Sequence, residues 1–289
     1  MDSGGDGLGK VYQIRAKDSR DGAVYACKVL RQSRDSDTSA EREAVLTISR
    51  GHHPNIVEVI DTWTEWVSSS TTCYIQMELC EGDLTGYLRK RYDVSPLTSA
   101  EIWRTFRQII SGIQYIHSLG MVHRDIKPKN SNPLKNDADS VLYITNSNLT
   151  LTWKITDFGF STTIQHSIRR PICVGEMTRN YFAPELLILS RADSKADIWS
   201  AGCILYKLAV GFPAFPSDEA IREYAWSGSK TPCVSDSRSD LGDEIEQIIG
   251  RMLDISPERR PDATTVLRYI KEAEGRCALA QCDGYMVTI

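Results

Sequence analysis

The sequence lacks an apolar segment long enough to cross a membrane. Its longest apolar run, residues 198–210, is interrupted by Ser200 and Lys207, whereas a membrane-spanning helix needs about 20 mostly apolar residues. The opening residues are small and polar, without the basic and apolar stretches of a secretion signal. We therefore expect no membrane partner and an intracellular location, in the cytoplasm, the nucleus or both.

The sequence also lacks an excess of basic residues and any internal repeat. Its 34 Lys and Arg residues stand against 38 Asp and Glu residues, which gives a formal net charge of -4. Proteins dedicated to nucleic acid are usually strongly basic, so we expect no nucleic-acid partner. Nothing in the sequence indicates an oligomer, and a monomer is the default expectation.

No two cysteines form a C-x-x-C pair, and their scatter favours reduced thiols of an intracellular protein over a disulfide framework. Cys277 and Cys282, near the C-terminus, are close enough in sequence to leave a disulfide open as an alternative. The eight cysteines are Cys27, Cys73, Cys80, Cys173, Cys203, Cys233, Cys277 and Cys282.

The rest of the composition is typical of a folded globular chain. Hydrophobic residues make up 41% and charged residues 25%, which excludes a wholly disordered chain. The length of 289 residues suggests one large or two modest domains, since a domain averages roughly 150 residues.

Local patterns divide the chain into two parts. Up to residue 98 the pattern is that of short strands and one helix, which a capping box at Thr38 and Glu41 opens. Beyond it the apolar period is helical, beginning with a second capping box at Thr98 and Glu101. The expected strands are 11–16, 24–30, 56–63 and 73–79, with a loop at 68–72, and the expected later helices are 98–117, 193–210, 217–226, 242–254 and 262–274.

These patterns predict an α+β fold with two lobes. The first lobe, residues 1–80, is a small antiparallel β-sheet with one helix. The second lobe, residues 81–275, is larger and mainly helical, and residues 276–289 form a tail. Residues 81–83 read Glu-Gly-Asp and are expected to act as a hinge between the lobes.

Three short motifs carry the chemistry. Residues 123–130 read HRDIKPKN, residues 157–159 read DFG and residues 183–185 read APE. Each tripeptide is common by chance, but this order at loop positions is specific. From Gly4 to about Ile270 the chain resembles the eukaryotic protein kinases, which implies the two-lobed kinase fold and transfer of the γ-phosphate of ATP to a protein substrate. The competing interpretation of residues 123–125 is a capped turn after a helix.

The residue types suit phosphoryl transfer, which depends on positioning, metal ions and charge neutralisation. Asp125 can accept the proton of an attacking hydroxyl, and Lys127 can place a cation against the moving phosphoryl group. Asn130 and Asp157 offer the hard oxygen ligands that Mg²⁺ prefers. We therefore assign Asp125, Lys127 and Asn130 to catalysis, and Asn130 and Asp157 to metal binding.

Lys28 lies in the middle of an apolar strand, where an unpaired ammonium group is costly. The resemblance implies that it grips the α- and β-phosphates and is held by a helix carboxylate. A lysine on an edge strand, with its ammonium in water, is the alternative. Glu41 and Glu43 compete as the partner, and we expect Glu43 because the capping box with Thr38 already uses Glu41.

The glycine-rich start departs from the family pattern G-x-G-x-x-G-x-V, whose backbone covers the phosphates. Its last glycine and valine match Gly9 and Val11, but Asp6 falls on the second glycine, or one residue is deleted. The strand expected before this loop is nearly absent, and a flexible tail is the competing interpretation. The glycines available for this role are Gly4, Gly5, Gly7 and Gly9.

Residues 77–83 resemble the segment that binds adenine and ribose. Met77 matches the gatekeeper position at the back of the nucleotide pocket, Glu78 and Cys80 the backbone contacts with adenine, and Asp83 a ribose contact. Ala26, two residues before the strand lysine, completes the expected nucleotide contacts. Plain core packing is the alternative for Met77, and Cys80 is also explained as an ordinary apolar residue.

Two further features refine the activity. Lys127 and Thr178 match the serine/threonine type of the family. Arg124 matches an arginine that often pairs with a phosphate on the segment between the DFG and APE motifs, although a solvated loop explains this segment equally well. The candidate phosphorylation sites are Ser161, Thr162, Thr163 and Ser167.

Other matches are structural. The resemblance implies that Asp197 orients the backbone of the catalytic loop and that Glu185 pairs with Arg260. Asp157 follows Asn130 by 27 residues, about twice the usual gap in the family. We expect residues 131–150 to form an inserted loop or hairpin near the active site.

The leading hypothesis is an active serine/threonine protein kinase that uses ATP and Mg²⁺. A pseudokinase that scaffolds a partner is the alternative, favoured by the imperfect glycine loop and the insertion. A small-molecule kinase is the third possibility, which the APE motif disfavours. The acidic residues of the hinge region and second lobe favour basic residues around the phosphorylated hydroxyl, although charge counts alone do not decide this.

Overall fold

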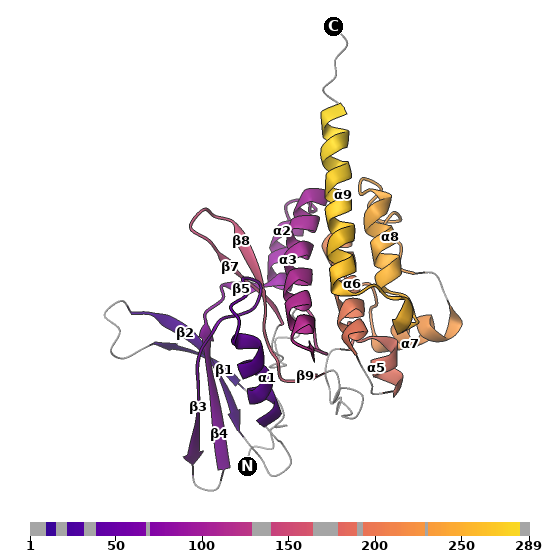
Figure 1. Cartoon of the computed structure of the whole chain (residues 1–289). Coiled ribbons are helices and arrows are strands. Elements are labelled where there is room, and N and C mark those ends of the chain that lie inside the picture. The colour runs from indigo at the N-terminus through magenta and orange to yellow at the C-terminus, as the bar shows by residue number, and fades with distance from the viewer. Residues whose placement is uncertain are drawn as a thin grey trace.

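The computed structural model shows two lobes, a β-sheet with one helix and a larger helical lobe, joined near β5 (Figure 1). This confirms the predicted α+β class. The residues that the structure describes are 10–15, 22–31, 39–67, 70–128, 140–163, 179–189, 193–228 and 231–283.

The first lobe contains an antiparallel sheet with the strand order β1-β2-β4-β3. Helix α1 packs against it with Ala44, Val45 and Ile48, all buried, at the spacing of one helical face. The elements are β1 (Lys10–Arg15), β2 (Val24–Arg31), α1 (Ser39–Ser49), β3 (Val59–Val67) and β4 (Ser70–Glu78).

The third and fourth strands differ from the sequence prediction. The expected loop at 68–72 was too long, because β3 reaches Val67 and pairs there with Ser70 at the start of β4. Thr71 and Thr72 belong to the ladder, in keeping with the preference of threonine for strands. The part of this Ser/Thr-rich stretch from Ser70 onward is therefore strand.

The second lobe is mainly helical, with small sheets at its seam with the first lobe. Its early elements are β5 (Gly82–Asp83), α2 (Leu84–Tyr92), α3 (Ser99–Ser118), β6 (Met121–Val122), β7 (Val141–Thr145), β8 (Leu151–Ile155) and β9 (Thr162–Thr163). Its later elements are α5 (Pro184–Leu189), α6 (Ser194–Val210), α7 (Asp218–Ser227), α8 (Asp243–Met252), η1 (Pro257–Arg259) and α9 (Ala263–Asp283).

Helix α6 forms the centre of this lobe, between α3 and α8 in Figure 1. Its residues from Ala196 to Val210 are all buried, as expected for a helix that is apolar on every side. Gly202 allows the close approach of α8, because a Cβ there would lie 2.9 Å from Met252. Gly211 ends the helix with a φ of 93°, a conformation that favours glycine.

The predicted start of α3 is confirmed in detail. The Thr98 hydroxyl accepts a hydrogen bond from the backbone of Glu101, and the Glu101 carboxylate accepts one from the backbone of Thr98. Helix α2, by contrast, was not predicted, since its short, strongly basic sequence has no clear apolar period. Helix α9 also continues past residue 275, into the predicted tail.

The lobes are joined by the chain itself and by hydrogen bonds between them. The chain passes between them at residues 79–81, which we call the hinge. Of the hinge expected at residues 81–83, Gly82 and Asp83 instead form β5. A second, hydrogen-bonded connection is formed by Asn55, whose amide nitrogen donates to the carbonyl of Trp153 at 2.9 Å and whose carbonyl accepts from Ile155 at 2.9 Å. Gly112 of α3 permits it, because a Cβ there would lie 2.7 Å from the Asn55 carbonyl. We call this second connection the Asn55 clasp.

No helix within the described ranges is both long and apolar enough to cross a membrane. The cysteines whose side chains the structure describes are all free thiols, as predicted for reduced cysteines.

Candidate active site

Lys28 is held between two carboxylates. Strand β2 carries its side chain into the space between the lobes, where its Nζ lies 2.6 Å from Glu41 Oε1 on α1 and 2.6 Å from Asp157 Oδ1. Lys28 is 4% exposed, so solvent screens these pairs little. Burial opposes the charged form, but the two carboxylates outweigh it and raise the pKa of Lys28 above its usual value. The edge-strand alternative is thereby excluded.

The expectation that Glu43 is the partner of Lys28 was wrong. Glu43 is exposed, whereas Glu41 shares the face of α1 that also carries Ala44 and Val45 and packs against the sheet. Residues three and four positions apart lie on one face of a helix, and residues two apart do not. Assigning Glu41 to a capping box caused the error.

Asp157 occupies a special backbone position at the start of the DFG motif. Its φ is 65°, which is uncommon for a residue other than glycine. Burial opposes its ionisation, but Lys28 outweighs that penalty and holds the pKa of the carboxyl below its usual value. The next residue, Phe158, packs edge-on against the ring of His123 with centroids 5.4 Å apart. Asp157 is therefore a buried carboxylate in a fixed orientation.

Asp125 and Lys127 form a buried ion pair, with Lys127 Nζ 2.9 Å from Asp125 Oδ2. The loop that carries them is anchored by Asp197 at the start of α6. This carboxylate accepts hydrogen bonds from the backbone nitrogens of His123, at 2.9 Å, and Arg124, at 2.8 Å. The predicted role of Asp197 is confirmed, and the buried helix α6 thus positions the loop.

The ring of His123 is bonded on both nitrogens. Nε2 lies 2.9 Å from the Thr156 carbonyl, and Nδ1 accepts from the Asp125 backbone at 3.3 Å. This arrangement suits a neutral ring with its proton on Nε2. Burial lowers the pKa of His123, so it links the loop to the DFG strand as a neutral group.

Ser140 connects the same loop to β7, and sequence reasoning missed it. Its hydroxyl accepts a hydrogen bond from the Lys127 backbone nitrogen at 2.6 Å and donates to the Lys127 carbonyl at 2.9 Å. Its own carbonyl accepts from Thr156, next to Asp157, at 3.0 Å. Ser140 is completely buried. The one available signal was its place directly before the apolar run of residues 141–144.

The expected nucleotide contacts gather at the centre of the sheet. Val11 pairs with Lys28 across β1 and β2, and Ala26 pairs with Met77 across β2 and β4. Met77 also contacts the other lobe, since its Sδ lies 3.9 Å from Thr156 Oγ1. The sheet register thus brings four of the predicted nucleotide residues together.

The side chains around the hinge have structural contacts of their own. The Glu78 carboxylate pairs with Lys154 at 2.7 Å, which leaves backbone groups as the adenine contacts expected there. Burial and the neighbouring Glu78 raise the pKa of Cys80 to about 12, so its thiol is protonated. Asp83 caps α2 through a 2.8 Å hydrogen bond from Gly86, a role that the sequence analysis did not foresee.

The region between the two lobes also contains the beginning of the segment from Asp157 to Glu185, which we call the activation segment. The Arg124 guanidinium donates to the Phe160 carbonyl at 2.7 Å. The hydroxyl of Ser161, one of the candidate phosphorylation sites, is buried, and among the described residues it has no hydrogen-bond partner. The Arg124 side chain therefore contacts the backbone of the activation segment.

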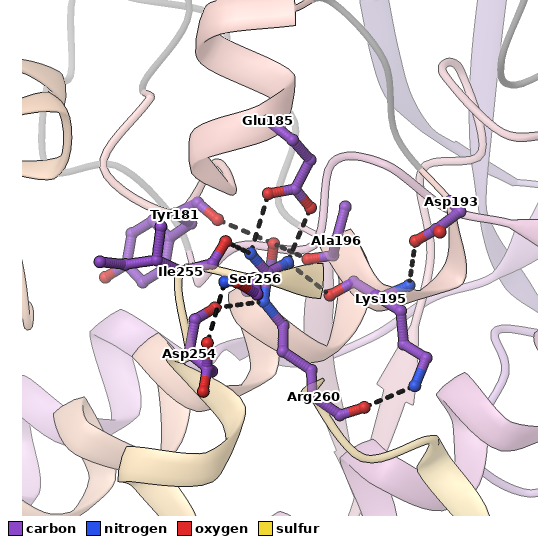
Figure 2. Close-up of polar contacts among 10 residues, drawn as sticks. Tyr181, Glu185, Asp193, Lys195, Ala196, Asp254, Ile255, Ser256 and Arg260 are labelled. Carbon is purple, nitrogen blue, oxygen red and sulfur yellow. Dashed lines mark hydrogen bonds and ion pairs between the residues drawn. The ribbon is translucent and has the colours of Figure 1, made fainter. Parts of the chain in front are cut away.

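The activation segment ends in the predicted ion pair between Glu185 and Arg260. Figure 2 shows both guanidinium nitrogens of Arg260 directed at the Glu185 carboxylate, at 2.7 and 2.8 Å. The same guanidinium donates to the carbonyls of Asp254, Ile255 and Lys195 and stacks over the Trp199 ring. The side chain of Arg260 is completely buried.

Some predicted residues lie outside the described residues. They are Gly4, Gly5, Gly7, Gly9, Thr38, Asn130, Ser167 and Thr178. The predicted insertion is described in part: β7 and β8 form a hairpin from 141 to 155, and the earlier part of the insertion is not among the described residues. Within the described ranges, no three His, Cys, Asp or Glu residues gather as a metal site.

The fold and these contacts agree with comparisons to known proteins. Residues 4–269 match the protein kinase domain family. The chain belongs to this family, as the motif resemblance implied. It is 30% identical over 254 residues to ribosomal protein S6 kinase alpha-2 of Mus musculus, covering 86% of this chain and 32% of that protein. It is 29% identical over 271 residues to MAP kinase-activated protein kinase 2 of Oryctolagus cuniculus, covering 90% and 68%.

A third relative is calcium-dependent protein kinase 5 of Plasmodium falciparum, 26% identical over 261 residues, with 89% of this chain and 42% of that protein covered. The chain thus spans about a third of S6 kinase alpha-2 and two fifths of the Plasmodium kinase.

Proposed function

We propose that this chain transfers the γ-phosphoryl group of ATP, with Mg²⁺, to serine or threonine hydroxyls of proteins. The observation that carries the proposal is the assembly of two buried ion-paired groups: Lys28 with Glu41 and Asp157, and Lys127 with Asp125. A protein that only binds partners has no need to keep these costly buried charges in place. Membership of the protein kinase domain family supports the same activity.

The donor set fits the nucleotide and the metal. Lys28 provides a buried cation for phosphate oxygens, and Asp157 provides carboxylate oxygens, which are hard ligands suited to Mg²⁺. Asp157 accepts the hydrogen bond of Lys28 through Oδ1. Its other carboxylate oxygen, Oδ2, is a hard ligand of the same kind. Asn130 is proposed as the other metal ligand. When bound, Mg²⁺ neutralises phosphate charge and orients the phosphoryl group.

The chain itself positions the acceptor hydroxyl. In our proposal Asp125 orients this hydroxyl and accepts its proton, while Lys127 keeps a positive charge beside the transferred group. The anchoring of the loop by Asp197 keeps Asp125 in place throughout. Lys127 and Thr178 favour a serine or threonine acceptor, because they match that type of the family.

The test is phosphorylation by the purified chain. Wild type with ³²P-labelled ATP and Mg²⁺ should label itself or a mixed peptide library at Ser and Thr, and Asp125→Asn should reduce labelling at least a hundredfold. Circular dichroism and thermal melting of the variant must show an intact fold. Labelling that survives Asp125→Asn would overturn the assignment of the base. A folded wild type that binds ATP without any labelling would overturn the enzyme and favour the pseudokinase.

A further inference from the structure

Four lysines of the described residues are buried, and their partners differ. Lys28 pairs with Glu41 and Asp157, Lys127 with Asp125, and Lys154 with Glu78 at 2.7 Å. The fourth is Lys207 in α6, which is 8% exposed. In the described part of the chain no carboxylate lies within 4.0 Å of its ammonium group. Lys207 is therefore the exception among the buried lysines.

The surroundings of Lys207 only partly compensate its charge. Its Nζ lies 3.2 Å from the neutral hydroxyl of Thr85 at the start of α2. Burial lowers the pKa of Lys207, and the more distant carboxylate of Asp83 raises it. Burying an ammonium group without a counter-ion is costly, so a lysine in this position gains from an anion supplied by a ligand.

The position of Lys207 relates it to the active site. Helix α6 begins beside the catalytic loop, which Asp197 anchors, and Lys207 follows ten residues later along the same helix. At 1.5 Å per residue, the two positions are about 15 Å apart. Near the C-terminal end of α6, Lys207 contacts α2, which directly follows the hinge and β5. Lys207 therefore lies on the second lobe, between the catalytic loop and the hinge side.

A bound peptide can bridge this distance. An extended chain advances about 3.3 Å per residue, so about five residues of a bound peptide span the length of α6 between Asp197, which holds the catalytic loop, and Lys207. We propose that Lys207 binds an anionic side chain of the protein substrate, within five residues of the phosphorylated hydroxyl. This inference rests on the proposed kinase activity. It differs from the expectation of basic residues around the phosphorylated hydroxyl. That expectation rested on the number of acidic residues, whereas the present inference rests on the buried positive charge of Lys207.

The experiment compares matched peptides. A series with one Ser acceptor carries a single Glu at each of the five positions before and after it, and the control series carries Gln there. Wild type should show at least a tenfold higher kcat/KM for one or more Glu peptides, because a hydrogen-bonded charge pair is strong when partly buried. Phosphoserine in place of that Glu tests whether the anion recognised is a carboxylate or a phosphate.

The variants separate Lys207 from general effects. Lys207→Met removes the charge at similar length, and it should bring the Glu-to-Gln ratio to about one. Lys207→Arg should retain a ratio above one, and Lys207→Glu should favour a Lys peptide over the Glu peptide. Lys90→Met, a matched change on the exposed face of α2, should keep the wild-type ratio. Thermal melting establishes that each variant is folded.

Peptide binding, measured by fluorescence anisotropy, keeps this inference distinguishable from the proposed activity. Tighter binding of the Glu peptide to wild type than to Lys207→Met, in the absence of any turnover, would refute the kinase activity and support the anion site. Turnover with equal kcat/KM for Glu and Gln peptides at every position would refute the anion site alone. A ratio unchanged by Lys207→Met would refute it as well.

Discussion

Arg260, directly after η1, holds Glu185 at the end of the activation segment through two parallel hydrogen bonds, 2.7 and 2.8 Å long. The guanidinium reaches three backbone carbonyls in addition (Figure 2). One buried side chain thus ties together three separate stretches of the second lobe.

Replacing Arg260 should therefore destabilise the protein strongly. In Arg260→Leu the Glu185 carboxylate loses its partner while largely buried, and breaking a buried pair from one side costs about 3–5 kcal/mol. Chemical denaturation should show this loss. Arg268→Leu, which breaks an exposed pair with Glu272, should change the free energy of unfolding by less than about 1 kcal/mol. Equal effects of the two variants would contradict the role given to Arg260.

Glu41 and Glu43 provide a matched pair for the lysine partner. Glu41→Gln removes the charge that holds Lys28, and we expect kcat/KM for phosphorylation to fall about tenfold or more, in line with the loss of a charged hydrogen bond. Glu43→Gln, on the exposed face of α1, should stay within about twofold of wild type. Steady-state kinetics with varied ATP measure both. A larger effect at Glu43 would restore the assignment made from the sequence.

Ser140 and Ser161 are both buried, but among the described residues only the Ser140 hydroxyl has hydrogen-bond partners, and the Ser161 hydroxyl has none. Ser140→Ala leaves the Lys127 backbone N–H without its acceptor and should cost about 1–3 kcal/mol in the free energy of unfolding. Ser161→Ala removes a hydroxyl without a described partner and should be neutral or stabilising. Chemical denaturation of the two variants measures these changes in the free energy of unfolding. A destabilisation confined to Ser161→Ala would refute the structural role given to the Ser140 hydroxyl.

His123 should make stability fall in mild acid. Its pKa lies below the usual 6.5 because of burial, so below about pH 6.5 the unfolded chain takes up a proton that the folded chain does not. The free energy of unfolding then decreases by up to about 1.4 kcal/mol per pH unit as the pH falls toward the folded pKa. His123→Phe cannot titrate, so its free energy of unfolding should depend less steeply on pH between about pH 6.5 and 5. The difference in slope corresponds to the uptake of up to one proton. Identical slopes would show that His123 does not contribute.

The sequence predicted the parts of the site that are defined by spacing along the chain. Asp125, Lys127 and Asp157 are predicted from two motifs and Lys28 from its place in an apolar strand, and their ion pairs are present in the structure. The capping box at Thr98 and the positions of the later helices were also readable, because they depend on neighbouring residues.

The sequence could not predict the parts of the site that depend on which side chains face each other in the folded structure. The choice between Glu41 and Glu43 required the face of α1 that meets the sheet. The hydrogen bonds of Ser140 join positions 13 residues apart, with no pattern between them. The contrast between Lys207 and the other buried lysines depends on which carboxylates lie nearby, which a count of acidic residues cannot show.

The two connections between the lobes, the hinge at residues 79–81 and the Asn55 clasp, restrict how the lobes can move. The contact of Lys28 with Asp157 is a further connection, formed by side chains alone. Moving the first lobe away from Asp157 separates two opposite charges in a buried environment, so the free energy of this ion pair opposes opening of the lobes.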